Sequence, residues 1–475
     1  MKRRWWPDLA LAVVAAAGAA LALRALRSPT DDAFWQIAYG RAILAHHALP
    51  AVDTYSWTAA GHAVVVTEWA FDTLLAAAVA AGPWAAYLLA AICILALGWS
   101  TLTLCTHLSR RRGTAGLLAL GVLLCVAPFE TLLPQLASFG LLALVWAVLE
   151  SARSARRPRA LWLLPPLFAL WANVHGTFYL GLALVALDAL LAHAPTLPGR
   201  LVARYRRASR RALPWVLLAS AAATLANPYG WRLYGPELAL AGSPFHLERI
   251  AEFQSPNFHM PLLHWVILPA LLLALGVALG TTCRLPAREV VAALGLLAGS
   301  LVMVRLLPYA LVGLAALAAG ALRGDRQALP PARWWQLGVV GVIVGGAVVA
   351  IPPPAWPPTG GAPVAAAAYV RQHLVGRGFN TYEWGGYLLW VWRGDPAVYV
   401  DSRGDMYDTT WVIPAYTALI DVTVDPSRQL RQEGVTWALL PKEARLATVL
   451  RIEGWTSAFS GGPAVVLLAP AAGSG

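Results

Sequence analysis

Two adjacent carboxylates, Asp31 and Asp32, are the residues of this chain best suited by type and spacing to move a proton. Because like charges repel, one of two neighbouring carboxylates has a raised pKa, which suits it to accept a proton from a nucleophile. The pair also follows Thr30 and precedes an apolar-periodic run, and such residues commonly cap helices. A general base and a helix start therefore both remain open here.

A lone arginine and a histidine are candidates for contacts to a ligand. Arg305 is the only charged residue between Glu289 and Arg323, and a guanidinium forms bidentate pairs with phosphate oxygens. The alternative is an arginine whose side chain reaches lipid headgroups. His175 ends an apolar segment, where polar groups usually face a cavity, although a helix-end histidine can instead bond to backbone. Arg305 is therefore the first candidate for a phosphate contact.

The segment 246–259 is dense in charged and amide side chains for so apolar a chain. Its histidines and carboxylates could bind a metal, but their spacing matches no defined ligand pattern. A solvated loop is the simpler interpretation for any single residue. Within this segment we select Arg249, Gln254, Asn257 and His259 as candidate contacts to a substrate.

Glu68 begins a short apolar helix. It could bind a divalent metal or position a substrate, or it could be a first-turn carboxylate that the helix dipole favours. Together with Asp31 and Asp32 it forms the carboxylate set that we consider for a metal ion. A divalent cation is therefore a candidate cofactor, although no ligand pattern requires one.

Four residues near the C-terminus form a further polar group. They could line an acceptor groove or act as a lid, or they could only stabilise a turn and a strand end, which we favour. The group comprises Tyr382, Glu383, Asp401 and Arg403.

The composition is that of a membrane protein. Hydrophobic residues make up 59% and charged residues 13% of the chain, against roughly 45–50% and 25% in ordinary globular domains, and the mean hydropathy is +0.59. The net charge of +12 comes from short basic clusters between apolar runs, which is the pattern of cytoplasmic loops and argues against nucleic-acid binding. The four cysteines form no CxxC pair, so a disulfide framework or a metal knuckle is not expected.

Apolar segments long enough to cross a bilayer recur along the chain. A span needs about 20 apolar residues, and by this measure we predict about eleven spans, the first of them uncleaved. Their approximate bounds are 8–26, 84–107, 114–131, 136–150, 160–175, 177–193, 213–226, 263–281, 289–304, 306–322 and 334–351.

The basic clusters orient these spans. With the N-terminus in the cytoplasm, every basic loop falls inside if the run from Glu68 to Gly82 does not cross the membrane. That run carries Glu68 and Asp72 and is short, so we predict a juxtamembrane or re-entrant helix. The chain is then a multi-pass protein of the inner or plasma membrane with its C-terminus outside. The basic inner loops are 108–113, 151–159, 194–212, 282–288 and 323–333.

The predicted fold is an all-α polytopic membrane domain followed by a small α/β extracytoplasmic domain. We place the membrane domain at 1–351, a proline-rich linker at 352–363 and the α/β domain at 364–475. The large first outward loop, 27–82, is expected to contain a helix over Phe34–His47. In the tail we predict a helix at Val364–Val375 and strands at Gly386–Trp392, Ala397–Val400, Thr436–Leu440 and Val465–Leu468.

This topology and its first loop resemble the GT-C glycosyltransferases, which include protein O-mannosyltransferases and the lipid A aminoarabinose transferase. The likeness rests on the segment Pro29–Arg41 with its acidic pair, on Asp53-Thr54-Tyr55-Ser56-Trp57 and on Thr67-Glu68-Trp69. Looser matches are Trp171-x-Asn173-x-His175-Gly176, Asn227-Pro228-Tyr229-Gly230, Ser255–His259, Tyr382–Tyr387 and Asp401–Arg403. The family's pair is usually Asp-Glu, whereas this chain has Asp-Asp.

The resemblance implies a fold, a reaction and partners. The fold is GT-C-like, with juxtamembrane helices in the first outward loop. The reaction is inverting transfer of a sugar from a polyprenyl phosphate, a lipid-linked donor, to an extracytoplasmic glycan, lipid or protein. Asp32 or Asp31 would be the base, and Arg305, His175 and Arg249 would bind the donor phosphate. Two alternatives remain: a lipid or polysaccharide transporter or flippase without covalent chemistry, and a non-catalytic envelope scaffold.

Overall fold

The computed structural model describes ten stretches of the chain. They divide between two compact units, which are treated separately below. The helical unit comprises Met1–Ser28, Ala81–Leu233 and Leu247–Trp356, and the mixed unit comprises Pro29–Ala80, Tyr234–His246 and Pro357–Gly475. The described residues are 6–25, 31–129, 131–154, 158–194, 201–202, 205, 207–281, 284–323, 361–407 and 410–470.

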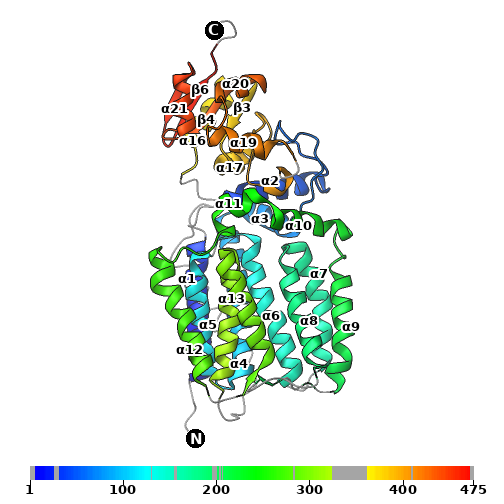
Figure 1. The fold of residues 1–475 in the computed structure, drawn as a ribbon. Coiled ribbons are helices and arrows are strands. Elements are labelled where there is room, and N and C mark those ends of the chain that lie inside the picture. Colours follow the sequence, from blue (N-terminus) through cyan, green and yellow to red (C-terminus); the bar gives the residue numbers. More distant parts are fainter. Residues whose placement is uncertain are drawn as a thin grey trace. The chain divides into compact units, whose positions relative to one another are not determined.

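The helical unit is a bundle of roughly parallel helices (Figure 1). α14 is its central element, because every residue from Leu307 to Ala321 is buried. A Cβ atom built on Gly140 would lie 3.0 Å from the backbone nitrogen of Leu97, so this glycine lets two helix backbones pack closely. The helices are α1 (Trp6–Ala25), α4 (Pro83–Ser109), α5 (Arg112–Val126), α6 (Pro134–Ser154), α7 (Leu164–Val174), α8 (Phe178–Leu191), α9 (Arg207–Ala223), α12 (Leu268–Gly280), α13 (Ala287–Val302) and α14 (Leu307–Ala321).

Short elements complete the helical unit. A two-stranded parallel ladder joins β1 (Leu201–Val202) to β2 (Leu285–Pro286). The remaining turns are η1 (Ala127–Phe129), η2 (Pro158–Leu163), η3 (Gly230–Leu233), η4 (Ala251–Phe253), η5 (Leu263–Ile267) and η6 (Val304–Leu306).

Five helical segments are long and apolar enough to cross a membrane. Apolar side chains on them are exposed, among them Leu117 at 74% and Leu279 at 75%, as expected where lipid is the solvent. The chain therefore has the helices of a membrane protein, whereas the number of spans and their orientation stay predictions. The predicted span 334–351 lies outside the described residues. The five segments are Pro83–Ser109, Arg112–Phe129, Pro134–Arg153, Leu263–Gly280 and Val304–Ala321.

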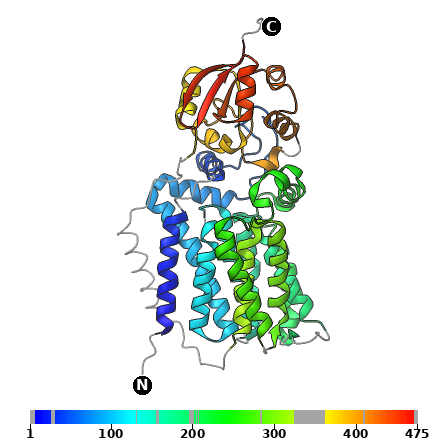
Figure 2. The same ribbon diagram turned by 60° about the vertical axis from the view of Figure 1, so that its left-hand side comes forward.

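The mixed unit contains a four-stranded sheet in the order β3-β4-β6-β5, visible at the red end of the chain in Figure 2. β3 is parallel to β4, and the other neighbours are antiparallel. Its elements are α2 (Asp32–His46), α3 (Trp69–Ala81), α10 (Tyr234–Gly242), the start of α11 (Pro244–Arg249), α16 (Val364–His373), β3 (Arg377–Asn380), α17 (Tyr382–Trp392), α18 (Gly404–Tyr407), α19 (Val412–Ile420), α20 (Pro426–Gln432), β4 (Val435–Pro441), α21 (Arg445–Ile452), β5 (Thr456–Gly461) and β6 (Ala464–Leu468).

The core of the mixed unit joins parts of the chain that are far apart in sequence. Phe34 and Ala38 of α2 pack in one buried cluster with Tyr387 and Leu388 of α17 and with Val466 of β6. The first loop thus belongs with the tail in one compact unit, whereas the predicted boundaries separated it from residues 364–475.

Some of the helices and strands predicted for the tail are confirmed, and others are wrong. The helix at Val364–Val375 and the strands at Thr436–Leu440 and Val465–Leu468 are confirmed by α16, β4 and β6. The strand predicted over Gly386–Trp392 is wrong, because this aromatic run lies in helix α17, where it buries one face in the core. The strand predicted at Ala397–Val400 is also wrong.

Val398 makes only an isolated bridge with Ser56. β3 and β5 were not predicted, since Arg377–Asn380 is short and contains a glycine, and Thr456–Gly461 has little apolar alternation.

Candidate functional site

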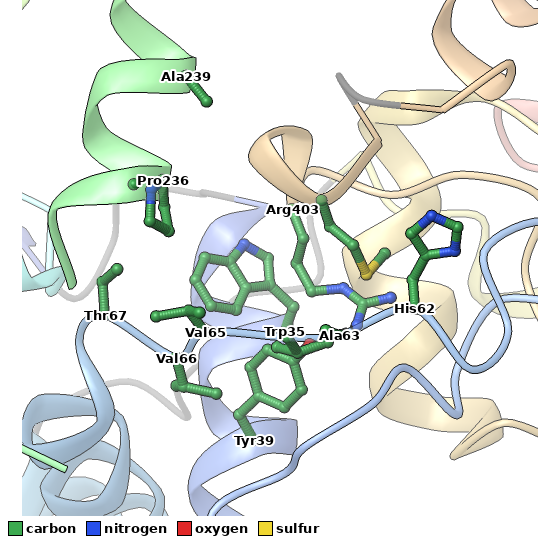
Figure 3. Close-up of a pocket in the computed structure, with 13 residues that line it drawn as sticks. Trp35, Tyr39, His62, Ala63, Val65, Val66, Thr67, Pro236, Ala239 and Arg403 are labelled. Atoms are coloured by element: carbon green, nitrogen blue, oxygen red, sulfur yellow. Dashed lines mark hydrogen bonds between the residues drawn. The ribbon is translucent and has the colours of Figure 1, made fainter. Parts of the chain in front are cut away.

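A cavity of about 270 Å³ lies within the mixed unit (Figure 3). Its wall combines aromatic side chains of α2, the extended segment before α3, one face of α10 and the start of α18. Most of the lining side chains are apolar, with Arg403, His62 and Tyr39 as the charged or titratable members. The lining residues are Trp35, Tyr39, His62, Ala63, Val64, Val65, Val66, Thr67, Gly235, Pro236, Ala239, Arg403 and Met406.

Asp32 is joined to the wall of this cavity. It is the first residue of α2, where the positive end of the helix dipole favours a carboxylate. The indole N–H of Trp35 donates to the Asp32 carboxylate over 3.2 Å, and the same Trp35 ring lines the cavity. Asp32 is thus half-buried and reaches the cavity through Trp35, without lining it itself.

Asp31, the neighbouring carboxylate, has different partners. It occupies the N-cap position of α2, yet its side chain makes no bond to that helix. Instead its two carboxylate oxygens accept the backbone N–H groups of Gly386 and Tyr387 in α17, each over 3.2 Å. Asp31 therefore stands at the start of α2, as one of the two interpretations of the sequence allows, but its carboxylate holds α17 and not α2.

Two glycines of α17 make this attachment possible. A Cβ atom on Gly386 would lie 2.6 Å from the Asp31 carbonyl oxygen and 2.8 Å from its Oδ2. A Cβ atom on Gly385 would overlap the backbone of Val400 and Asp401. The pair lies inside α17 at a point where other segments approach the helix closely.

The pKa of Asp31 is raised well above its ordinary value of 3.8. Burial is the main cause and the charge of Asp32 is the second, while the hydrogen bonds from Gly386 and Tyr387 act in the opposite direction. The charge of Asp32 thus contributes to the raised pKa of Asp31, as the sequence predicts for adjacent carboxylates.

Arg403 is buried at the centre of a closed polar cluster. Its Nε and Nη2 atoms bind the two oxygens of Asp401 at 2.7 and 2.6 Å. Its Nη1 atom donates to Asp53 at 2.7 Å and to the Tyr39 hydroxyl at 2.6 Å, and Nη2 also reaches the Tyr407 hydroxyl at 3.5 Å. A guanidinium has five N–H donors, and this cluster uses all of them.

The cluster ties the first loop to the tail within the mixed unit. Asp53 also accepts the backbone N–H groups of Tyr55 and Ser56, which stabilises a local turn. Burial raises the pKa of Tyr39 and of Tyr407, which keeps both hydroxyls neutral. The Tyr39 hydroxyl accepts from Arg403, and the Tyr407 hydroxyl donates to Asp401 at 2.8 Å. The sequence analysis named Arg403 and Asp401 as candidate substrate contacts. In the structure their bonds instead hold the first loop against the tail.

The other two predicted tail residues differ in exposure. Tyr382 is buried, its backbone N–H donates to the Tyr416 hydroxyl, and its own hydroxyl donates to the Ser402 carbonyl at 3.3 Å. Glu383 is exposed in the first turn of α17. Glu68, from the first loop, accepts the side-chain amide of Gln36 at 2.8 Å.

A second group of predicted residues, Arg305 and His175, lies in the helical unit. The Arg305 guanidinium lies 4.4 Å from the centroid of the Phe253 ring and 3.6 Å from a carboxylate oxygen of Glu252. The backbone N–H of Val304 donates to the Gln254 carbonyl at 2.8 Å, which fixes the segment that carries these contacts. The Arg305 side chain is 22% exposed, so it is mostly buried by these contacts.

His175 is buried close to this arginine. The charge of Arg305 acts on its imidazole, so the two predicted phosphate contacts lie within electrostatic range of one another. The Nδ1 atom of His175 bonds to the hydroxyls of Ser138 and Thr177 at 2.9 and 2.8 Å, and Thr177 bonds to the Tyr309 hydroxyl at 2.9 Å. This network links α6 and α14 through the turn between α7 and α8.

The remaining predicted contacts lie on the surface of the helical unit. Arg249 is exposed at the end of α11, and the Gln254 side chain donates to the Glu248 carbonyl at 2.6 Å. Asn257 and His259 form a local turn, because the His259 backbone N–H donates to the Asn257 side chain at 3.0 Å. These contacts agree with a solvated loop.

The sequence did not predict a buried charged cluster in the helical unit. Arg288 binds Asp188 at 2.9 Å and Glu150 at 2.7 Å, and its Nε atom binds Glu289 at 2.9 Å. Arg153 also binds Glu150, at 2.5 Å. The cluster lies at the ends of α6, α8 and α13 and not at their middles, so it does not form the midplane site expected of a transporter.

No protein-family model matches the chain, and no curated protein sequence matches it. Within the described residues no group of three or more histidine, cysteine, aspartate and glutamate side chains is arranged to hold a metal ion. Of the carboxylates considered for a metal, Asp31 bonds to α17 and Glu68 to Gln36.

Proposed function

We propose that the protein is a membrane glycosyltransferase of the GT-C type. It moves a sugar from a polyprenyl phosphate carrier to an extracytoplasmic acceptor. The apolar helices, the carboxylate beside a cavity in the mixed unit and the partly exposed Arg305 of the helical unit support this proposal. The single observation that carries it is the bond between Trp35 and Asp32, which joins one carboxylate of the acidic pair to the cavity wall.

In the proposed step Asp32 accepts the proton of an acceptor hydroxyl while that oxygen forms a bond to the anomeric carbon of the sugar. The bond between the anomeric carbon and the phosphate oxygen breaks, and its electron pair leaves with the polyprenyl phosphate. The configuration inverts because the acceptor attacks opposite the leaving group.

Arg305 is assigned to the leaving phosphate. A guanidinium offsets the charge that develops on phosphate oxygens, and the Phe253 ring beneath the guanidinium restricts its orientation. His175 is assigned to hold the surrounding turn through Ser138 and Thr177.

The phosphate assignment is tested by donor kinetics in membranes that contain the Arg305→Gln variant. A hydrogen bond to a charged group contributes about 1.5–3 kcal/mol, so the KM for a labelled polyprenyl phosphate sugar should rise about tenfold or more. Arg232→Gln, which changes an exposed arginine of the same unit, should leave the KM unchanged. An unaltered KM in Arg305→Gln would remove Arg305 from the proposal.

A further inference from the structure

The carboxylate of Asp72 is buried without a hydrogen-bond partner. Asp72 lies in the first turn of α3 with 0% of its surface exposed, and neither of its carboxylate oxygens has a partner among the described residues. Buried polar groups in proteins are almost always paired, because an unpaired one loses its hydration without compensation. Both oxygens of Asp72 therefore lack a donor or a cation.

A second unpartnered oxygen lies on the helix packed against Asp72. Gln36 of α2 is 2% exposed, and its amide nitrogen donates to Oε2 of Glu68 at 2.8 Å. Its amide oxygen, Oε1, is buried and has no partner within the described part of the chain. The Gln36 amide oxygen and the Asp72 carboxylate, on two different helices, thus both lack a donor or a cation.

Close packing of α2 on α3 holds these groups together. Gly40 follows Gln36 by one helical turn, and a Cβ atom there would overlap the Asp72 carbonyl and lie 2.7 Å from the Ala76 side chain. The backbone N–H of Asp72 donates to the Glu68 carbonyl at 3.0 Å. Glu68 and Asp72 are therefore one turn apart on one face, the face that meets α2.

The chemistry of this group matches a hard cation. Burial, and next the charge of Glu68, raise the pKa of Asp72, so both carboxylates can be ionised together only if a cation offsets their charge of −2. Carboxylate and amide oxygens are the ligands that Mg²⁺, Mn²⁺ and Ca²⁺ prefer, and a divalent ion would neutralise the pair.

We propose that Asp72, Glu68 and the amide oxygen of Gln36 bind one divalent cation between α2 and α3. The ligand set shares only Glu68 with the carboxylates that the sequence suggested for a metal, and it is independent of the reaction proposed above. Bound there, the ion would join α3 to α2, the helix that carries Asp32 and Trp35.

The test uses the purified full-length protein in detergent, stripped with a chelator and titrated with Mn²⁺, Mg²⁺ or Ca²⁺ alone. We expect saturable binding of one ion per chain by equilibrium dialysis, and a thermal unfolding midpoint that rises by several degrees on saturation. Asp72→Asn should lose both effects, and Glu443→Gln, at an exposed carboxylate of the same unit, should keep both.

Absence of saturable binding by the wild-type chain would overturn the proposal, as would full binding by Asp72→Asn. If Asp72→Asn does not fold, Gln36→Leu serves in its place and should weaken binding at least tenfold. A third outcome is that the wild-type chain binds no ion and Asp72→Asn unfolds at a higher temperature. Asp72 would then be protonated in the wild type, which also contradicts the proposal.

Discussion

The indole N–H of Trp35 donates to the carboxylate of Asp32, and the ring of the same tryptophan lines the cavity of the mixed unit. The preceding residue, Asp31, instead accepts two backbone N–H groups of α17. Two adjacent and chemically identical residues thus have different surroundings, which suits Asp32 to chemistry and Asp31 to structure.

Asp31→Asn should destabilise the mixed unit. The amide keeps one acceptor oxygen but presents an NH₂ group to a backbone N–H, so one hydrogen bond is replaced by a clash of donors. We expect a loss of about 1–3 kcal/mol, measured by thermal or denaturant unfolding in detergent. Asp395→Asn, at an exposed position, is the matched control. An Asp31→Asn protein as stable as this control would contradict the structural role.

The stability of the protein should depend on pH through Asp31. Its folded-state pKa is raised above the ordinary value of 3.8, mainly by burial and next by the charge of Asp32. The folded chain therefore binds more protons than the unfolded chain between pH 3.8 and the raised pKa, and the contribution of Asp31 falls as pH rises through that window.

Unfolding midpoints measured across pH for three proteins test this dependence. Asp31→Asn should lack the decline seen in the wild type. Asp32→Asn removes the second cause of the shift, so its decline should end at a lower pH. Superimposable profiles for the wild type and Asp31→Asn would exclude Asp31 as the titrating group.

Arg403→Met should destabilise the mixed unit more than any surface change. The substitution leaves Asp401 and Asp53 buried without their cation, and breaking a buried ion pair on one side costs about 3–5 kcal/mol. The change in unfolding free energy is compared with that of Arg428→Met, which removes an exposed arginine. Equal stabilities for the two variants would show that the cluster does not hold the unit together.

Gly386→Ala should separate α17 from the first loop. The added Cβ would lie 2.6 Å from the Asp31 carbonyl oxygen, so Asp31 or the helix must move. Gly113→Ala, in α5, adds a methyl group where nothing lies within 4 Å, and should stabilise by about 0.5–1 kcal/mol. Unfolding midpoints measure both changes. A Gly386→Ala protein that gains stability like Gly113→Ala would contradict the close approach.

Much of the fold could be predicted because its signals are local. Apolar runs between basic clusters indicated α1, α4 to α9 and α12 to α14, and β4 and β6 are apolar runs of strand length. α17 could not be predicted as a helix, because its aromatic residues favour strands locally and only burial against α2 decides otherwise.

The site was predictable in its residue types but not in its partners. The adjacent aspartates marked the first loop, yet nothing local shows that Asp31 bonds to residues 386 and 387 or that Asp53 pairs with Arg403. These partners lie more than 300 residues apart in the chain, and a single sequence contains no signal for such contacts. Trp35 and His62 of the cavity lining were missed for the same reason.

The central claim is tested most directly by sugar transfer from a radiolabelled polyprenyl phosphate sugar to envelope acceptors, in membranes that contain wild-type protein or Asp32→Asn. We predict that Asp32→Asn transfers at a rate lower by about 10²–10⁴, as expected for loss of a general base, while its unfolding midpoint at neutral pH is no lower than that of the wild type. Full transfer by a folded Asp32→Asn protein would contradict the account.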